Sequence, residues 1–118
     1  MLRVQIQLTR AGVIRSIRAQ GHAGYAPSGS DIVCAAATAL LRAAARTFER
    51  KAGIVVTGGA ERRGEMALDV ISIADGVSEW AAGASETVVQ GLADIAAEFP
   101  DAVSVEIEQE EEKERNGS

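Results

Sequence analysis

Residues 2–19 read LRVQIQLTRAGVIRSIRA. In the first seven of these residues apolar and polar side chains alternate, which is typical of a β-strand with one buried face. Ala11 and Gly12 then form a short turn, and residues 13–19 are expected to return as the partner strand. The chain is therefore predicted to begin with a β-hairpin, and the remaining elements have to cover its apolar face.

A long helix is predicted after this hairpin. Residues 32–51 contain neither Gly nor Pro and are rich in Ala and Leu, which are strong helix formers. Asp31 is a favoured N-cap residue and Gly53 is suited to the helix end. Because residues 32–41 are nearly all apolar, we expect the first half of the helix to be buried on most sides.

The rest of the chain predicts three strands and a second helix. The strands are residues 54–58, 66–73 and 102–108. The helix is expected to start with Ser78 as its N-cap and to be stopped by Pro100. Its apolar side chains recur at spacings of three and four and form a stripe of Ala81, Ala84, Val88, Leu92, Ile95 and Phe99.

The resulting order is β-β-α-β-β-α-β, which predicts the α+β class, with one sheet and two helices packed on it. We expect a single domain over residues 1–109 and an acidic, disordered tail over residues 110–118. With 118 residues, 47% of them hydrophobic, the chain can build one modest core.

Composition excludes several kinds of site. The chain has one cysteine and one histidine, so it has neither an internal disulfide nor a cysteine-based zinc site. We expect no metal and no cofactor. No apolar run approaches the roughly 20 residues of a membrane helix, and residues 1–10 contain no signal-peptide core. We therefore expect a cytoplasmic protein that does not contact a membrane.

The charge is unevenly distributed. The net charge is −5, but residues 1–50 carry seven Lys or Arg against two Asp or Glu, and the remainder carries five against fifteen. Six of the nine residues 106–114 are Glu, which indicates a solvated edge and a frayed tail, or alternatively a surface that attracts a basic partner. The basic side chains at 42, 46 and 50 form a short solvated stripe without aromatic residues, so we expect no nucleic-acid binding.

The chemistry is concentrated in residues 21–40, GHAGYAPSGSDIVCAAATAL. If Asp31 is the N-cap, Cys34 is the third helical residue, where unpaired amides and the positive end of the helix dipole favour a thiolate. The same amides could stabilise an oxyanion. His22 lies in a loop between glycines, which could bring its imidazole to the sulfur. A Cys–His pair of this kind is the minimal unit for thiol attack on an amide.

Ordinary interpretations of these residues stay open at this point. A cysteine in an Ala-rich helix is commonly a small buried hydrophobic residue, and a histidine beside glycines is commonly a loop residue. Asp31 is either a structural cap or a carboxylate that orients His22. A carboxylate close to the sulfur would also oppose thiolate formation.

Two motifs at this separation resemble the ribosomal-processing cysteine protease family, Prp. They are Gly21-His22-Ala23 and the segment Asp31-Ile32-Val33-Cys34-Ala35. The opening hairpin, the length and the helix order also fit. The resemblance implies a cytoplasmic, homodimeric endopeptidase without a cofactor. Its partner would be a large-subunit ribosomal protein precursor, from which it removes an N-terminal extension during ribosome assembly.

The resemblance also implies roles for individual residues. The catalytic pair falls on His22 and Cys34, Gly21 is the hinge of a mobile loop, and Asp31 belongs to the neighbourhood of the active site. The loop is expected to become ordered over the substrate.

Two further helix residues carry expectations about substrate binding. The family's substrate is apolar and aromatic before the cleavage site, and the small side chains of Ala35 and Ala36 leave room for it. Thr38 stands where the family usually has Ser, one helical turn after the nucleophile and on the same face. Thr keeps the hydroxyl and adds a methyl group, so a polar contact could be kept while the pocket narrows.

Two other function classes compete with the protease. One is a non-catalytic, ribosome-associated interaction protein with the same fold, against which only the intact pair His22 and Cys34 argues. The other is a small thiol hydrolase, which would turn over thioesters or small amides and leave ribosomal peptides uncut.

Overall fold

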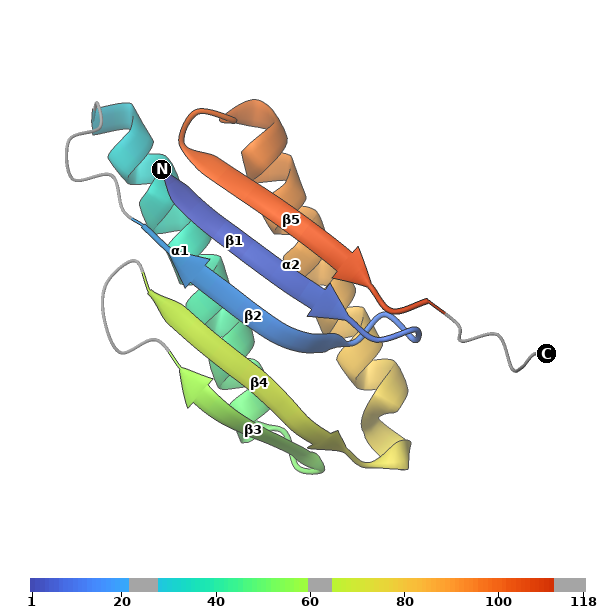
Figure 1. The fold of residues 1–118 in the computed structure, drawn as a ribbon. Helices are drawn as coiled ribbons and strands as arrows, with labels where there is room; N and C mark the ends of the chain where they lie inside the picture. The colour runs from blue at the N-terminus through green and yellow to red at the C-terminus, as the bar shows by residue number, and fades with distance from the viewer. Residues whose placement is uncertain (22–27, 60–64, 112–118) are drawn as a thin grey trace.

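The computed structural model describes residues 1–21, 28–59 and 65–111, with residues 28–31 described as main chain only. Its elements follow the predicted order β-β-α-β-β-α-β, and the α+β class is confirmed (Figure 1). The elements are β1 Leu2–Leu8, β2 Ile14–Gln20, α1 Ser28–Arg50, β3 Ile54–Gly59, β4 Met66–Ile73, the short 3₁₀ helix η1 Asp75–Val77, α2 Ser78–Glu98 and β5 Val103–Gln109.

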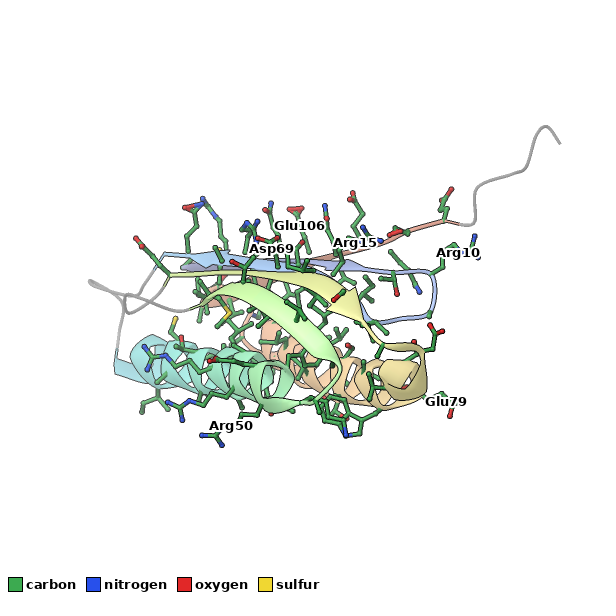
Figure 2. The ribbon with its side chains drawn as sticks, turned by 90° about the horizontal axis from the view of Figure 1, so that it is seen from below. Arg10, Arg15, Arg50, Asp69, Glu79 and Glu106 are labelled. Atoms are coloured by element: carbon green, nitrogen blue, oxygen red, sulfur yellow. The ribbon has the colours of Figure 1, made fainter. Side chains whose placement is uncertain are left out.

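The five strands form one sheet in the order β3-β4-β2-β1-β5. All neighbours are antiparallel except β1 and β5, which run parallel with Leu2 opposite Val103. Two parallel strands have to be joined by a crossover connection. Here α2, which packs on the sheet, leads the chain back to the end at which β5 starts beside β1. Both helices cover the same face of the sheet, so the domain has two layers (Figures 1 and 2).

The core lies between the sheet and the two helices. Every second residue of β1 is buried, as the alternation of the sequence predicts. The largest fully buried side chains include Phe48 of α1 and Leu92 of α2, which cover the strands from the helix layer. The other large and almost completely buried side chains are Leu2, Val4, Ile6, Ile14, Ile17, Leu41, Leu68 and Val103.

No helix of the described residues covers the opposite face of the sheet, which is mostly polar. Figure 2 shows Arg15, Asp69 and Glu106 pointing away from the helices on this face. Arg18 donates two hydrogen bonds to the carboxylate of Asp69, at 2.9 and 3.0 Å, and Arg15 pairs with Glu110. The paired side chains are about half exposed, so each ion pair contributes little to stability. Their chief effect is to keep this face solvated.

The outer side of α1 differs from the prediction. Ile32 is 70% exposed, and Ala35, Ala36 and Ala39 are exposed as well. The expectation that residues 32–41 are buried on most sides is therefore wrong within this chain. In a two-layer domain only one stripe of the helix faces the sheet, and here the stripe comprises Val33, Cys34, Ala37 and Leu41.

Most of the apolar stripe predicted for the second helix is buried or half-buried, as expected. Ala81, Val88 and Leu92 are buried, whereas Phe99 lies after the helix end and is 43% exposed. Ser78 is not the N-cap, because η1 runs directly into α2 and makes Ser78 the first helical residue.

Ser85 of α2 is a buried polar residue that the pattern did not predict. A β-bulge puts Gln7 opposite Ser16 and Leu8 opposite Ile14, so that Arg15 has no partner in β1. The amide of Ile14 instead donates to the hydroxyl of Ser85 at 2.9 Å. A helix side chain therefore satisfies a buried amide of the sheet.

The end of β5 bears on the predicted domain boundary. β5 ends at Gln109, and the amide of the next residue, Glu110, donates to the carbonyl of Leu8 at 2.9 Å. The predicted tail beyond Glu111 lies outside the described residues. In the part of the chain that the structure describes, neither helix is long and apolar enough to cross a membrane.

We predict that Ser85→Ala lowers the free energy of unfolding by roughly 1–3 kcal/mol, because it leaves the buried amide of Ile14 without an acceptor. Urea unfolding followed by circular dichroism measures the change. Thr87→Ala is the control, since its hydroxyl is exposed and donates to Gly83 of the same helix. Equal stabilities of the two variants would contradict the role of Ser85.

Candidate functional site

The predicted site lies at one end of the molecule. Strands β1 and β5 both begin there, β2 ends there, and α1 starts there (Figure 1). Gly21 directly follows β2, and Cys34 lies in the first part of α1. The two segments that contain the motifs therefore lie at the same end of the sheet, where these strands begin or end.

The position of Cys34 in the helix differs from the prediction. The helix begins at Ser28, so Asp31 is its fourth residue and Cys34 its seventh. Asp31 is therefore not the N-cap, and the assignment of Cys34 to the third helical position is wrong. The strong helix formers after Asp31 propagate the helix backwards through Ser28-Gly29-Ser30, because each added residue gains one hydrogen bond.

This shift removes one argument for a thiolate at Cys34. Only the first four amides of an α-helix lack an internal acceptor, and the dipole effect falls off within the first turn. The seventh residue lies beyond both effects. The helix terminus therefore supplies neither unpaired amides nor strong positive potential at the sulfur.

The side chain of Cys34 is largely buried. Its residue is 9% exposed, and the thiol donates a hydrogen bond to the main-chain carbonyl of Ala102 at a Sγ···O distance of 3.5 Å. Ala102 comes directly before β5 and is itself 5% exposed. The sulfur thus faces the start of β5, underneath the helix.

Thr38 lies one turn after Cys34 and is half-buried. It lines a narrow hollow between α1 and the strands, with a volume of about 10 Å³, which is room for one water-sized sphere. The other lining residues are Leu2, Ala19, Leu41, Arg42, Glu65 and Met66. Ala35 and Ala36 lie on the exposed side of the same helix.

Gly21 has a clear structural requirement. Its φ angle is +100°, and a Cβ atom at this position would lie 2.3 Å from the carbonyl oxygen of Met1. Both the left-handed conformation and the close approach exclude a larger residue. His22 lies outside the described residues, and so does the side chain of Asp31. That the Asp31 carboxylate orients His22, or instead opposes thiolate formation at Cys34, therefore stays a prediction.

Two contributors to this region were missed by sequence reasoning. Ala102 acts through its main-chain carbonyl, and Leu2 contributes a wall of the hollow. Neither residue type carries a chemical signal, so only their position in the folded chain reveals them. Among the described residues no group of three His, Cys, Asp or Glu side chains is arranged to hold a metal ion.

Comparison with solved structures identifies domains of the same architecture. SMU.848 from Streptococcus mutans is 25% identical, with a TM-score of 0.73 over 93% of this chain and 96% of that one. The essential ribosomal processing protease Prp from S. aureus shares the fold in two complexes, each covering 92% of this chain and 100% of that one. With a covalently linked product peptide its identity is 21% and its TM-score 0.72, and with a substrate peptide they are 20% and 0.74.

A comparison with curated proteins finds no matching relative. The family model of cysteine protease Prp, however, matches residues 1–104, which contain both motifs and every element up to the start of β5. The resemblance read from the motifs is thereby confirmed, and the chain belongs to the Prp family of cysteine proteases.

Proposed function

We propose that this chain is a cysteine endopeptidase that removes an N-terminal extension from a large-subunit ribosomal protein during ribosome assembly. One observation carries the proposal. The family is one of cysteine proteases, and Cys34 is the only cysteine of the chain, so a nucleophile of this class has to be Cys34. His22 is likewise the only histidine and hence the sole imidazole base that the sequence offers.

The chemistry follows that of a thiol hydrolase. His22 takes the proton of the Cys34 thiol, and the sulfur attacks the carbonyl carbon of the scissile amide. The tetrahedral intermediate collapses as the imidazolium protonates the leaving amine, which leaves a thioester on Cys34. Water then hydrolyses the thioester, with His22 again as the base. Asp31 is proposed to orient the imidazole, because the resemblance places it in the neighbourhood of the active site.

A peptide substrate is supported by the two complexes of the S. aureus protein, which hold a substrate peptide and a covalently linked product peptide. Ala35 and Ala36 are exposed on α1, and their small side chains leave room next to Cys34 for the apolar and aromatic substrate segment that the resemblance implies.

The resemblance also supports a homodimer. It supports a cytoplasmic location as well, because ribosome assembly takes place there. We predict that sedimentation equilibrium at micromolar concentration gives twice the chain mass of 12.3 kDa. The exposed apolar side of α1 around Ile32 is consistent with a covering partner. A protein that sediments as a monomer over this range would contradict the dimer.

We predict that Cys34→Ala, Cys34→Ser and His22→Ala each reduce peptide cleavage by about 10³-fold or more, because each removes a member of the dyad. The substrates are synthetic peptides that carry apolar N-terminal extensions of ribosomal proteins, and cleavage is followed by mass spectrometry. Thr38→Ser is the control, since it restores the residue usual in the family, and it should retain cleavage.

Each result of this experiment has a distinct meaning. Cleavage that persists in Cys34→Ala would exclude the proposed nucleophile. A well-folded wild-type protein that cleaves none of the peptides would favour the non-catalytic interaction protein, in which Cys34 is a core residue. Turnover of thioesters or small amides without peptide cleavage would favour the small thiol hydrolase.

The role of the small residues on α1 gives a separate prediction. Ala36→Phe should raise the KM for the peptide about tenfold while the free energy of unfolding stays within about 0.5 kcal/mol, because Ala36 is exposed. Ala43→Phe is the matched control on the same helix, exposed and about two turns farther on, and it should change neither quantity. Identical KM values for both variants would exclude Ala36 from substrate binding.

A further inference from the structure

Strand β5 forms one edge of the sheet, and among the described residues no strand lies on its outer side (Figure 1). The carbonyl of Ala102 accepts from the amide at the start of β1, and the amide of Glu110 donates to the carbonyl at its end. In a parallel pair the residues that bond to the neighbouring strand alternate. Residues 104, 106 and 108 therefore bond to β1, and Val105 and Ile107 direct their amides and carbonyls outward.

The outward main-chain groups of β5 are available to a further strand. Within the part of the chain that the structure describes, no main-chain hydrogen bond reaches Val105 or Ile107 from the outer side. A row of this kind is a template for strand addition, and several peptide-binding domains capture extended peptides in this way. With 7 residues, β5 offers an edge of about 23 Å.

The side chains of β5 give this edge two different faces. Glu106 lies on the open face of the sheet (Figure 2), and Glu108, two residues on, lies on the same face. Both are exposed, and neither forms a salt bridge with the residues that the structure describes. Val105 and Ile107 point to the helix side, where Val105 is half-buried and Ile107 is 42% exposed. A strand beside β5 thus meets carboxylates on one face and apolar side chains on the other.

The charge of the edge selects the strand that fits it. A second copy of β5 would bring its own glutamates to the same face, and like charges on neighbouring strands are destabilising. A segment with Lys or Arg at alternate positions would instead place a positive charge beside each carboxylate. Proteins that bind RNA phosphates are rich in these residues, and a large-subunit ribosomal protein is such a protein.

The position of the edge relates it to the candidate site. Ala102, whose carbonyl contacts the thiol of Cys34, comes directly before β5, and the strand runs from there to the other end of the sheet (Figure 1). The substrate segment before the cut is expected to be apolar and aromatic, so a basic segment has to follow the cut. A segment that leaves the site along this edge runs parallel to β5.

We propose that the open edge of β5 is a docking site for the basic segment that follows the cleavage site of the ribosomal protein precursor. The segment adds to the sheet as a parallel strand, and its Lys and Arg side chains lie beside Glu106 and Glu108. The inference rests on the proposed function for the identity of the substrate. Because the two carboxylates act away from the scissile bond, they determine substrate affinity and leave the chemical step unchanged.

The docking site is tested with a fluorescein-labelled peptide in which Lys alternates with Val over 7 residues, the length of β5. Fluorescence anisotropy at low ionic strength measures its Kd. We expect the double variant Glu106→Gln with Glu108→Gln to bind about 2- to 30-fold more weakly than wild type, the range for two exposed ion pairs. Glu49→Gln with Glu79→Gln is the control, because both residues are exposed on the helix layer and the net charge is the same. It should match wild type.

Strand addition is tested with two N-methylated forms of this peptide, one methylated at the Lys residues and the other at the Val residues. Only one of the two alternating sets can donate amide hydrogens to β5. One form should therefore bind at least about tenfold more weakly than the unmodified peptide, while the other keeps its affinity. Equal affinities of the two forms would exclude a paired strand.

Three other results would overturn the proposal. The unmodified peptide could fail to bind wild type, or it could bind both double variants equally well. Third, substitution of Glu106 and Glu108 could change the sedimenting mass and leave peptide binding unchanged, in which case the edge joins two copies of the chain.

These binding measurements do not require cleavage, so the two proposals can fail separately. With a cleavable peptide that carries Lys after the cut, the Glu106 and Glu108 double variant should raise KM and keep kcat. If the basic peptide binds as expected and wild type cleaves no peptide, the docking site stands and the protease function falls. If wild type cleaves and the double variant keeps both KM and Kd, only the docking site falls.

Discussion

The structure depends on the burial of one face of β1. This strand lies between β2 and β5, and its side chains at positions 2, 4, 6 and 8 are all buried beneath the two helices. Because both neighbours pair along nearly its full length, β1 determines the register of the strands on either side. The start of β5 and the end of β2 are consequently brought together next to its first residue.

The candidate site is built from this register. The first peptide unit of β1 contacts the residue after β2 and the residue before β5. The carbonyl of the latter residue, Ala102, accepts a hydrogen bond from the thiol of Cys34. The proposed nucleophile, Cys34, thus lies on a helix, while the main-chain carbonyl that it contacts lies directly before the edge strand β5. The contact between the thiol and the Ala102 carbonyl therefore joins the start of α1 to the main chain before β5.

The sheet has two faces with different functions. The helix side carries the core and the hollow beside Thr38, while the other side is covered by ion pairs and amide side chains. The sequence patterns anticipated this division correctly in β1, because a period of two assigns alternate residues to opposite faces. In α1 the corresponding prediction was wrong at Ile32, since a run of apolar residues does not reveal how many sides of a helix are covered.

The sequence by itself determined the order of the elements, the class of the fold, the family and the identity of the only available cysteine and histidine. These properties reside in periodicity, in helix formers and breakers, and in two short motifs, all of which are local. Only the tertiary structure decided where α1 begins relative to Cys34, which side of that helix is covered, and that Ser85 and Ala102 accept hydrogen bonds from Ile14 and Cys34. Those contacts join residues about 70 positions apart, and one of them uses a main-chain carbonyl that every residue possesses, so no local pattern can encode them.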